Sequence, residues 1–231
     1  MLRRLVALII LGTLAVAGLL AVLKATYPFV LASEKARTAV EVTEDLSQEL
    51  KAATHASDLI AFGILGSVIS IVTALACSSA SAPKNKIIGA LAGMIVGFAG
   101  GVAAGAIGHW YITHTQWQLD PLVQWTLRWT LILLPIAIAA GIATAMAGNF
   151  RRDIGNAQAG AVIGAVAAAL VFAVLHGSVT TMENFSVVMP GFFDNRILIV
   201  AAAMFGIGIG LLWQIKSPKA DEGRESVLGS R

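Results

Sequence analysis

The fold is predicted most directly by the stretch IIGALAGMIVGFAGGVAAGAIGH, residues 87–109. Its part Ile87–Gly108 contains no Asp, Glu, Lys or Arg, and a helix needs roughly 20 apolar residues to cross a bilayer. Glycine recurs there at every fourth residue, at Gly89, Gly93, Gly97, Gly101 and Gly105. Since small residues on one face let helix backbones approach closely in lipid, the stretch predicts a membrane-spanning helix packed tightly on a neighbour.

Five further apolar stretches have a similar length. They are Leu5–Leu23, Leu59–Cys77, Thr126–Ala147, Ala157–His176 and Ile197–Ile215. Together the six predict an all-α, polytopic membrane helix bundle with six transmembrane helices and glycine-ladder packing. No polar stretch is long enough for a separate core, so we expect one membrane domain over 1–231, with 216–231 as a flexible cytoplasmic tail.

The composition excludes several protein classes. Hydrophobic residues make up 57% of the 231-residue chain and charged residues only 13%, about half the roughly 25% of soluble domains. These values exclude a soluble enzyme, a disordered protein and a disulfide scaffold, and Cys77 is the only cysteine. The net charge of +3 comes from basic residues scattered at the ends of the spans, so nucleic acid is not an expected partner.

Basic residues predict the orientation. With the N-terminus inside, every inner segment carries at least two of them: Arg3, Arg4, Lys84, Lys86, Arg151, Arg152, Lys216, Lys219, Arg224 and Arg231. The two short outer loops keep only Arg128 and Arg196. This is the positive-inside distribution. We therefore expect a multi-pass protein of a bacterial inner membrane with both termini cytoplasmic.

The first span has two interpretations. MLRR followed by an apolar run resembles a signal peptide. However, the apolar run is longer than the usual 7–15 residues and no clean small-x-small cleavage site follows it. We favour an uncleaved signal anchor, with a cleaved signal peptide as the alternative; either way residues 24–57 lie outside.

Residues 34–57 form the only long polar stretch. Small and apolar residues spaced alternately three and four apart predict a helix with one narrow seam that runs on into the second span. The seam consists of Ala36, Ala39, Thr43, Leu46, Leu50, Ala53 and Ser57. A solvated helix lying against its own neighbours is favoured over a short coiled coil with a partner, because the seam holds only two leucines.

Aromatic residues gather around the outer ends of the third and fourth spans: Trp110, Tyr111, Trp117, Trp125 and Trp129. Amphipathic aromatic residues settle at the headgroup level, which predicts an outer aromatic belt, with residues 109–125 along the interface. Trp213 marks the inner edge of the last span. No charged residue lies in the middle of a span, which argues against a proton-driven pump.

Small residues also recur at helical spacing in the other spans. Gly160 and Gly164 lie in the fifth span, and Gly206 and Gly210 in the last, so we expect these to be helix-packing positions as well. A shift of 67 residues places Gly97 on Gly164 and His109 on His176. The shift suggests a tandem hairpin repeat related by an axis along the membrane normal.

His109 and His176 are candidate cofactor ligands. At one depth on packed helices, two imidazoles could ligate a haem or a metal. The competing interpretation is that both histidines bind water or headgroups at the interface, and tight packing would leave no room for a porphyrin. We therefore expect no cofactor, and the sequence contains no recognised catalytic motif.

Three functions follow, in order. The first is a non-catalytic structural or accessory subunit of a membrane assembly. The alternative is a small channel or transporter built from two tandem hairpins, and the third is a bis-histidine haem- or metal-binding electron carrier. The expected partners are the lipid bilayer and other membrane subunits or a second copy of the chain.

Overall fold

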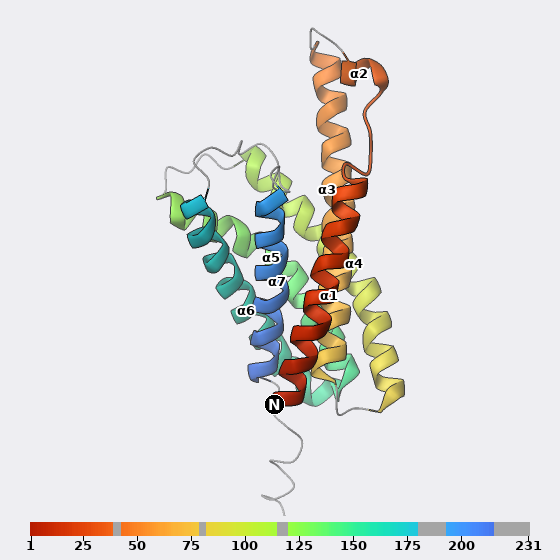
Figure 1. Cartoon of the computed structure of the whole chain (residues 1–231), viewed down its shortest axis with the longest axis vertical. Helices are drawn as coiled ribbons and strands as arrows, with labels where there is room; N and C mark the ends of the chain where they lie inside the picture. The colour runs from red at the N-terminus through yellow and green to blue at the C-terminus, as the bar shows by residue number, and fades with distance from the viewer. Residues whose placement is uncertain (39–42, 79–81, 115–119, 180–192, 215–231) are drawn as a thin grey trace, which may run out of the picture.

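Long helices, crossing the bundle in alternate directions, make up nearly all of the described chain (Figure 1). The computed structural model describes residues 1–38, 43–78, 82–114, 120–179 and 193–214, and the side chains of these except at 35, 121, 176–179, 193–195 and 214. The helices are α1 (Leu2–Thr26), α2 (Glu34–Thr38), α3 (Glu44–Cys77), α4 (Pro83–His114), α5 (Pro121–Ala147), α6 (Phe150–Val179) and α7 (Phe193–Gln214). Six of them, all except α2, are long and apolar enough to cross a membrane, and the described residues form no strand. The prediction of an all-α bundle with six spans is confirmed, and these helices fit a multi-pass integral membrane protein.

The helices extend beyond the predicted spans. Residues 109–114 continue α4, and 121–125 form the first turn of α5, where the Leu122 amide donates a 2.9 Å hydrogen bond to the Asp120 carboxylate. Such a cap satisfies an amide that has no partner within the helix. The prediction that 109–125 runs along the interface is therefore wrong for these two ends, and Trp117 lies outside the described residues.

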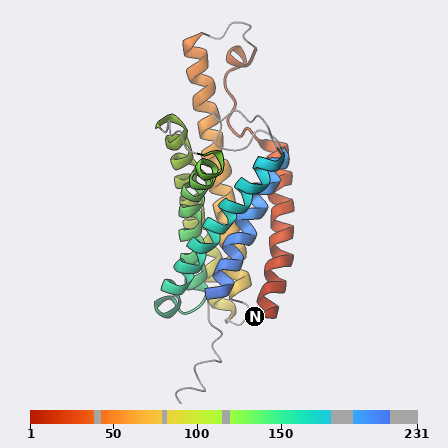
Figure 2. The same cartoon turned by 90° about the vertical axis from the view of Figure 1, so that its left-hand side faces the viewer.

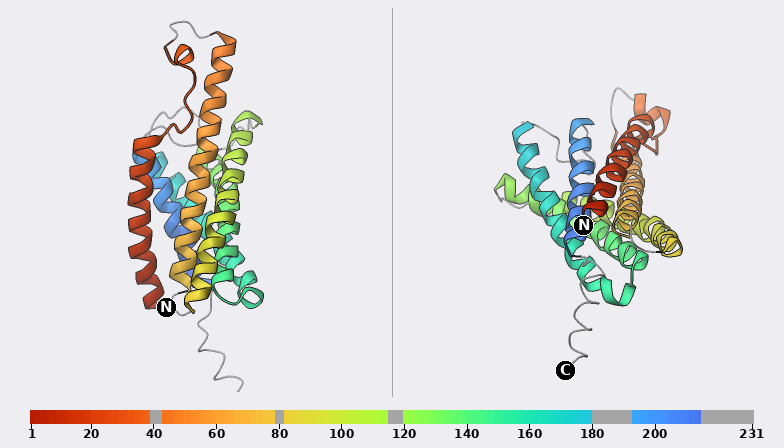
Figure 3. Two further views of the ribbon diagram at one scale, coloured as in Figure 1. Left: turned by 90° about the vertical axis from the view of Figure 1, so that its right-hand side faces the viewer. Right: turned by 60° about the horizontal axis from the view of Figure 1, so that its bottom comes forward.

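Two helices form the centre of the bundle. In the most apolar part of α3 and of α5, 61% of residues are buried, against 22% in α1 and 28% in α4. α3 contacts α1, α4, α5 and α7, and Figure 3 shows the helices grouped around one axis. The outward faces of α1, α4 and α6 carry large exposed apolar side chains, among them Leu14, Ile95 and Ile163, as contact with lipid requires.

The first helix is an integral part of the bundle. One face of α1 is buried, including Leu8, Val16 and Leu23. A Cβ added at Gly208 of α7 would lie 2.7 Å from Leu8 Cδ1, and one added at Gly12 would lie 3.0 Å from Phe205 Cε1. α1 therefore packs directly on α7; its retention in the mature protein stays a prediction.

α3 extends well beyond the other helices. Its 34 residues span about 51 Å, whereas the hydrocarbon layer is about 30 Å thick. Figures 1 and 2 show its first turns standing clear of the bundle beside α2. We call α2 together with residues 44–54 the arm, and the two ends of the bundle the arm side and the N-terminal side.

The single helix predicted over 34–57 is wrong in its first part. α2 ends at Thr38 and α3 begins at Glu44, after Thr43 in extended conformation. The Ser33 amide donates a 2.6 Å hydrogen bond to the Glu49 carboxylate, although a continuous helix would separate these positions by about 24 Å. The predicted continuity of the polar helix with the second span is confirmed from Glu44 onward.

The regularly spaced glycines of α4 face the backbone of α3. A Cβ added at Gly93 would lie 2.9 Å from the Ile71 nitrogen, and one at Gly97 would lie 2.6 Å from the Gly66 oxygen. A Cβ at Gly101 would fall on the Phe62 carbonyl oxygen, and one at Gly105 would lie 3.2 Å from Leu59 Cδ2. Gly89 instead faces Ala147 of α5. The contribution of these glycines to stability stays a prediction.

α6 and α7 also meet at small residues. A Cβ at Gly164 would fall on the Gly206 oxygen, and one at Gly210 on the Gly160 oxygen. Gly97 and Gly164, which the shift of 67 residues equates, thus face different neighbours: α3 precedes α4, whereas α7 follows α6. The tandem repeat stays a prediction.

Candidate functional site

Buried polar residues gather where the arm leaves the bundle. The Tyr27 hydroxyl, just after α1, donates a 2.8 Å hydrogen bond to Asp58 Oδ1 of α3. The guanidinium carbon of Arg196, at the start of α7, lies 4.4 Å from the centre of the Tyr27 ring, within the range of a cation–π contact. Asp58 is only 2% exposed and Ser57 is fully buried. We call Tyr27, Ser57, Asp58 and Arg196 the junction cluster; it connects α1, α3 and α7.

The segment after α1 is fixed to α3 by further hydrogen bonds. The Val30 amide donates to Ser57 Oγ at 2.9 Å, and the Ser57 hydroxyl donates to the Val30 oxygen at 3.2 Å. Higher along the arm, the Ser33 amide and hydroxyl both donate to the carboxylate of Glu49. The connection from α1 to α2 therefore lies along α3 and braces the arm at two levels.

The junction cluster holds Tyr27 in its neutral form. Burial, followed by the charge of Asp58 and the hydrogen bond to its carboxylate, raises the pKa of the Tyr27 phenol above its usual 10.0, and Arg196 partly opposes this rise. A neutral phenol donates to a carboxylate, whereas a phenolate would repel it. The cluster is thus a structural contact that persists through the physiological pH range.

A second cluster surrounds a buried arginine on α5. The guanidinium carbon of Arg128 lies 5.3 Å from the Trp125 ring centre and 5.9 Å from that of Trp129. The Trp129 ring in turn contacts Phe172 of α6 edge to face, with 4.9 Å between their centres. Arg128 is 4% exposed, and the buried Tyr111 of α4 lies within reach of its charge. This cluster connects α4, α5 and α6 near the arm side.

The aromatic belt is therefore only partly as predicted. Trp110 is exposed at 56%, as an interfacial residue should be, and so is Trp213 at the other end of the bundle. Trp129 and Tyr111 are instead buried, because the faces of α4 and α5 that carry them turn inward. Those two assignments to the belt are wrong.

His109 lies beside a different histidine from the one predicted. Its ring centre is 4.1 Å from that of His55 on α3, with the planes inclined by 36°. The side chain of His176 lies outside the described ones, so the predicted pairing of His109 with His176, and a haem or metal between them, stays a prediction. In the described parts of the chain, no three His, Cys, Asp or Glu side chains are grouped to hold a metal ion.

Sequence reasoning missed the most important residues of the junction cluster. Arg196 stood out as a charge at a span edge, but nothing local distinguishes Tyr27 or Asp58. Asp58 lies immediately before the apolar run that begins at Leu59, and an acidic residue there usually indicates only a helix end in water. The missed signal was its place beside Ser57 on the buried seam of the polar helix.

Known proteins add no assignment to this geometry. No protein-family model, curated protein or solved structure matches the chain.

Proposed function

We propose that this integral membrane protein is a non-catalytic structural or accessory subunit of a membrane assembly, and that its arm is the element that meets a partner. One observation carries the proposal: α3 runs without interruption from the middle of the bundle into the arm. A partner held by the arm would keep a fixed position relative to the membrane.

The bracing of the arm supports this function. Hydrogen bonds from Tyr27, Val30 and Ser33 to α3 hold the preceding segment against it. The seam residues Leu46 and Leu50 are half-buried on this side. Holding a partner by a rigid element costs less entropy than ordering a flexible one.

The opposite face of the arm is open. Glu44, Gln48 and Lys51 are exposed and, spaced four and three apart, share one face of the helix. Acidic, amide and basic groups together suit a polar protein surface better than the hydrocarbon layer. We propose that this face contacts the partner, on the outer side of a bacterial inner membrane, with both termini in the cytoplasm.

A channel or transporter is the second candidate. It is favoured by the burial of Asp58 and Arg128, since ionisable groups buried in membrane bundles often mark transport paths. Their contacts with Tyr27, Trp125 and Trp129 connect helices to one another, which supports a structural role more strongly.

The test is extraction of the native protein in mild detergent, followed by sizing and identification of co-purifying subunits. We expect a complex that Gln48→Trp and Lys51→Glu each dissociate, while the purified chain unfolds at an unchanged temperature. Lys84→Glu is the matched control, because Lys84 is equally exposed but lies at the N-terminal side. A native chain that migrates alone, or a complex indifferent to both arm variants, would contradict the proposal.

A further inference from the structure

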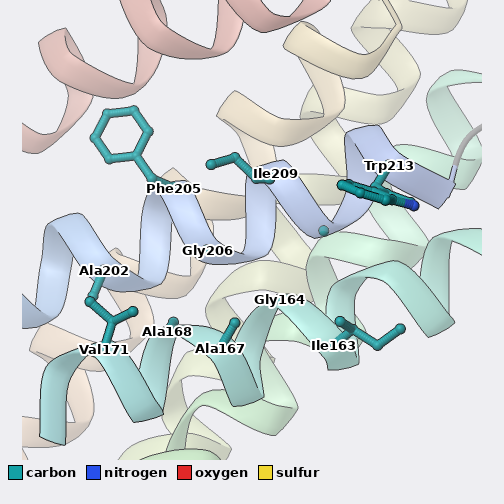
Figure 4. A pocket seen from close by; sticks show the side chains of 11 residues that line it. Ile163, Gly164, Ala167, Ala168, Val171, Ala202, Phe205, Gly206, Ile209 and Trp213 are labelled. Atoms are coloured by element: carbon teal, nitrogen blue, oxygen red, sulfur yellow. The ribbon is translucent and has the colours of Figure 1, made fainter. Parts of the chain in front are cut away.

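An open apolar groove runs along α6 and α7 on the outside of the bundle (Figure 4). Its volume is about 570 Å³, and its walls include Ile163, Ala167 and Val171 of α6 and Phe205, Ile209 and Trp213 of α7. Every residue that lines it is apolar or glycine. The floor is low because the two backbones touch at the glycines, where no side chain fills the space between them.

We propose that this groove binds one acyl chain of an anionic phospholipid, with the lipid phosphate near Arg152. The dimensions favour a hydrocarbon chain. The lining residues of α7, from Ala202 to Trp213, cover about 16 Å along the helix. This length matches one leaflet, which is half of the roughly 30 Å hydrocarbon layer.

The cross-section argues against a helix as the occupant. The volume of 570 Å³ over about 16 Å gives a mean cross-section of about 35 Å², less than half that of a helix about 10 Å across. A second copy of this chain, or a partner's membrane helix, would therefore have to dock above the groove without filling it. A flexible hydrocarbon chain can follow it along its length.

Charge at the N-terminal end of the groove favours an anionic lipid. Trp213 is 76% exposed there, as is typical of a residue at the headgroup level. Arg152 precedes Ile163 by eleven residues, or three helical turns, so both share one face of α6. The exposed Asn156 lies between them on that face. A phosphate at this level would meet Arg152 and Asn156 while its chain entered the groove.

The test uses native mass spectrometry of the purified protein from nanodiscs containing phosphatidylglycerol and phosphatidylcholine with identical acyl chains. We expect one retained lipid per chain, predominantly phosphatidylglycerol. Ala167→Trp should abolish retention by filling the groove, whereas Val166→Trp should not, because the exposed Val166 faces lipid outside the groove. Arg152→Gln should reduce the preference for phosphatidylglycerol by about fivefold. Arg151→Gln, which removes the same charge from another face, should leave the preference unchanged.

Several outcomes would overturn the assignment. Equal lipid retention by Ala167→Trp and Val166→Trp would place the lipid elsewhere. Loss of the headgroup preference with Arg151→Gln and not with Arg152→Gln would remove the proposed phosphate contact. A dimer, or a complex with another membrane protein, that dissociates only with Ala167→Trp would identify a protein as the occupant.

Discussion

The Tyr27 hydroxyl donates a 2.8 Å hydrogen bond to Oδ1 of Asp58, 31 residues further along the chain. The bond joins the end of α1 to α3 at the level where the arm leaves the bundle. Because Asp58 is almost completely buried, the donor helps to compensate for the removal of its carboxylate from water. The position of the arm thus depends on a contact between two distant parts of the chain.

Removing the Tyr27 hydroxyl should destabilise the protein. Tyr27→Phe keeps the ring beneath Arg196 but deprives the buried carboxylate of a donor, which typically costs about 1–3 kcal/mol. The free energy of unfolding in detergent measures this cost. In an Asp58→Asn background the same substitution should cost clearly less; an equal cost in both backgrounds would separate the effect from the hydrogen bond.

The same contact predicts a loss of stability in alkali. The pKa of Tyr27 is raised in the folded protein above its usual 10.0. The contribution of a group with a raised pKa is fully present below its unfolded pKa and is lost as the pH rises through the folded value. Above about pH 10 the wild type should therefore lose stability more steeply than Tyr27→Phe, as followed by thermal unfolding at stepwise pH. Parallel curves for the two proteins would refute the assignment.

The glycines of α4 should be intolerant of side chains. Gly97→Leu places a bulky group where even a Cβ would lie 2.6 Å from the Gly66 oxygen, and we expect a loss at or above the roughly 1–3 kcal/mol typical of overpacking. The control is Gly18→Leu on α1, because no atom lies within 4 Å of a Cβ added at Gly18. Comparable stability of the two variants would show that close approach at Gly97 is not required.

The first helix should be retained in the mature bundle. Leu8 is fully buried against α7, whereas Leu14 on the same helix is 66% exposed. Leu8→Ala should cost about 2–5 kcal/mol, while Leu14→Ala should have almost no effect on unfolding. If α1 were cleaved, intact mass would show its loss and both variants would behave alike.

The arm and the N-terminal side should lie on opposite faces of the membrane. Lys51 and Lys84 are both exposed, and the one described cysteine, Cys77, is buried. In spheroplasts, an impermeant thiol reagent should label Lys51→Cys from outside and label Lys84→Cys only after lysis. Labelling of both from outside would refute the topology.

The spans were predictable from the sequence, but the junction cluster was not. A run of apolar residues such as Ile87–Gly108 must be helical in lipid, because its backbone groups find no other partners there. The partners of Tyr27 depend on how α1, α3 and α7 are rotated and shifted against one another, and no local pattern records this. The same applies to Trp129: an aromatic residue at a span end suits the interface or the core, and the rotation of α5 determines which.

The rigid connection of the arm to the bundle is tested most directly by a distance between spin labels at Gln48 on the arm and Leu122 at the start of α5. Both positions are exposed, and Cys77→Ser removes the native thiol. Pulsed electron–electron double resonance in lipid nanodiscs should give one narrow distance distribution, which broadens when Asp58→Ala removes the junction contact. A broad distribution in the chain with an intact junction cluster would contradict a rigid arm.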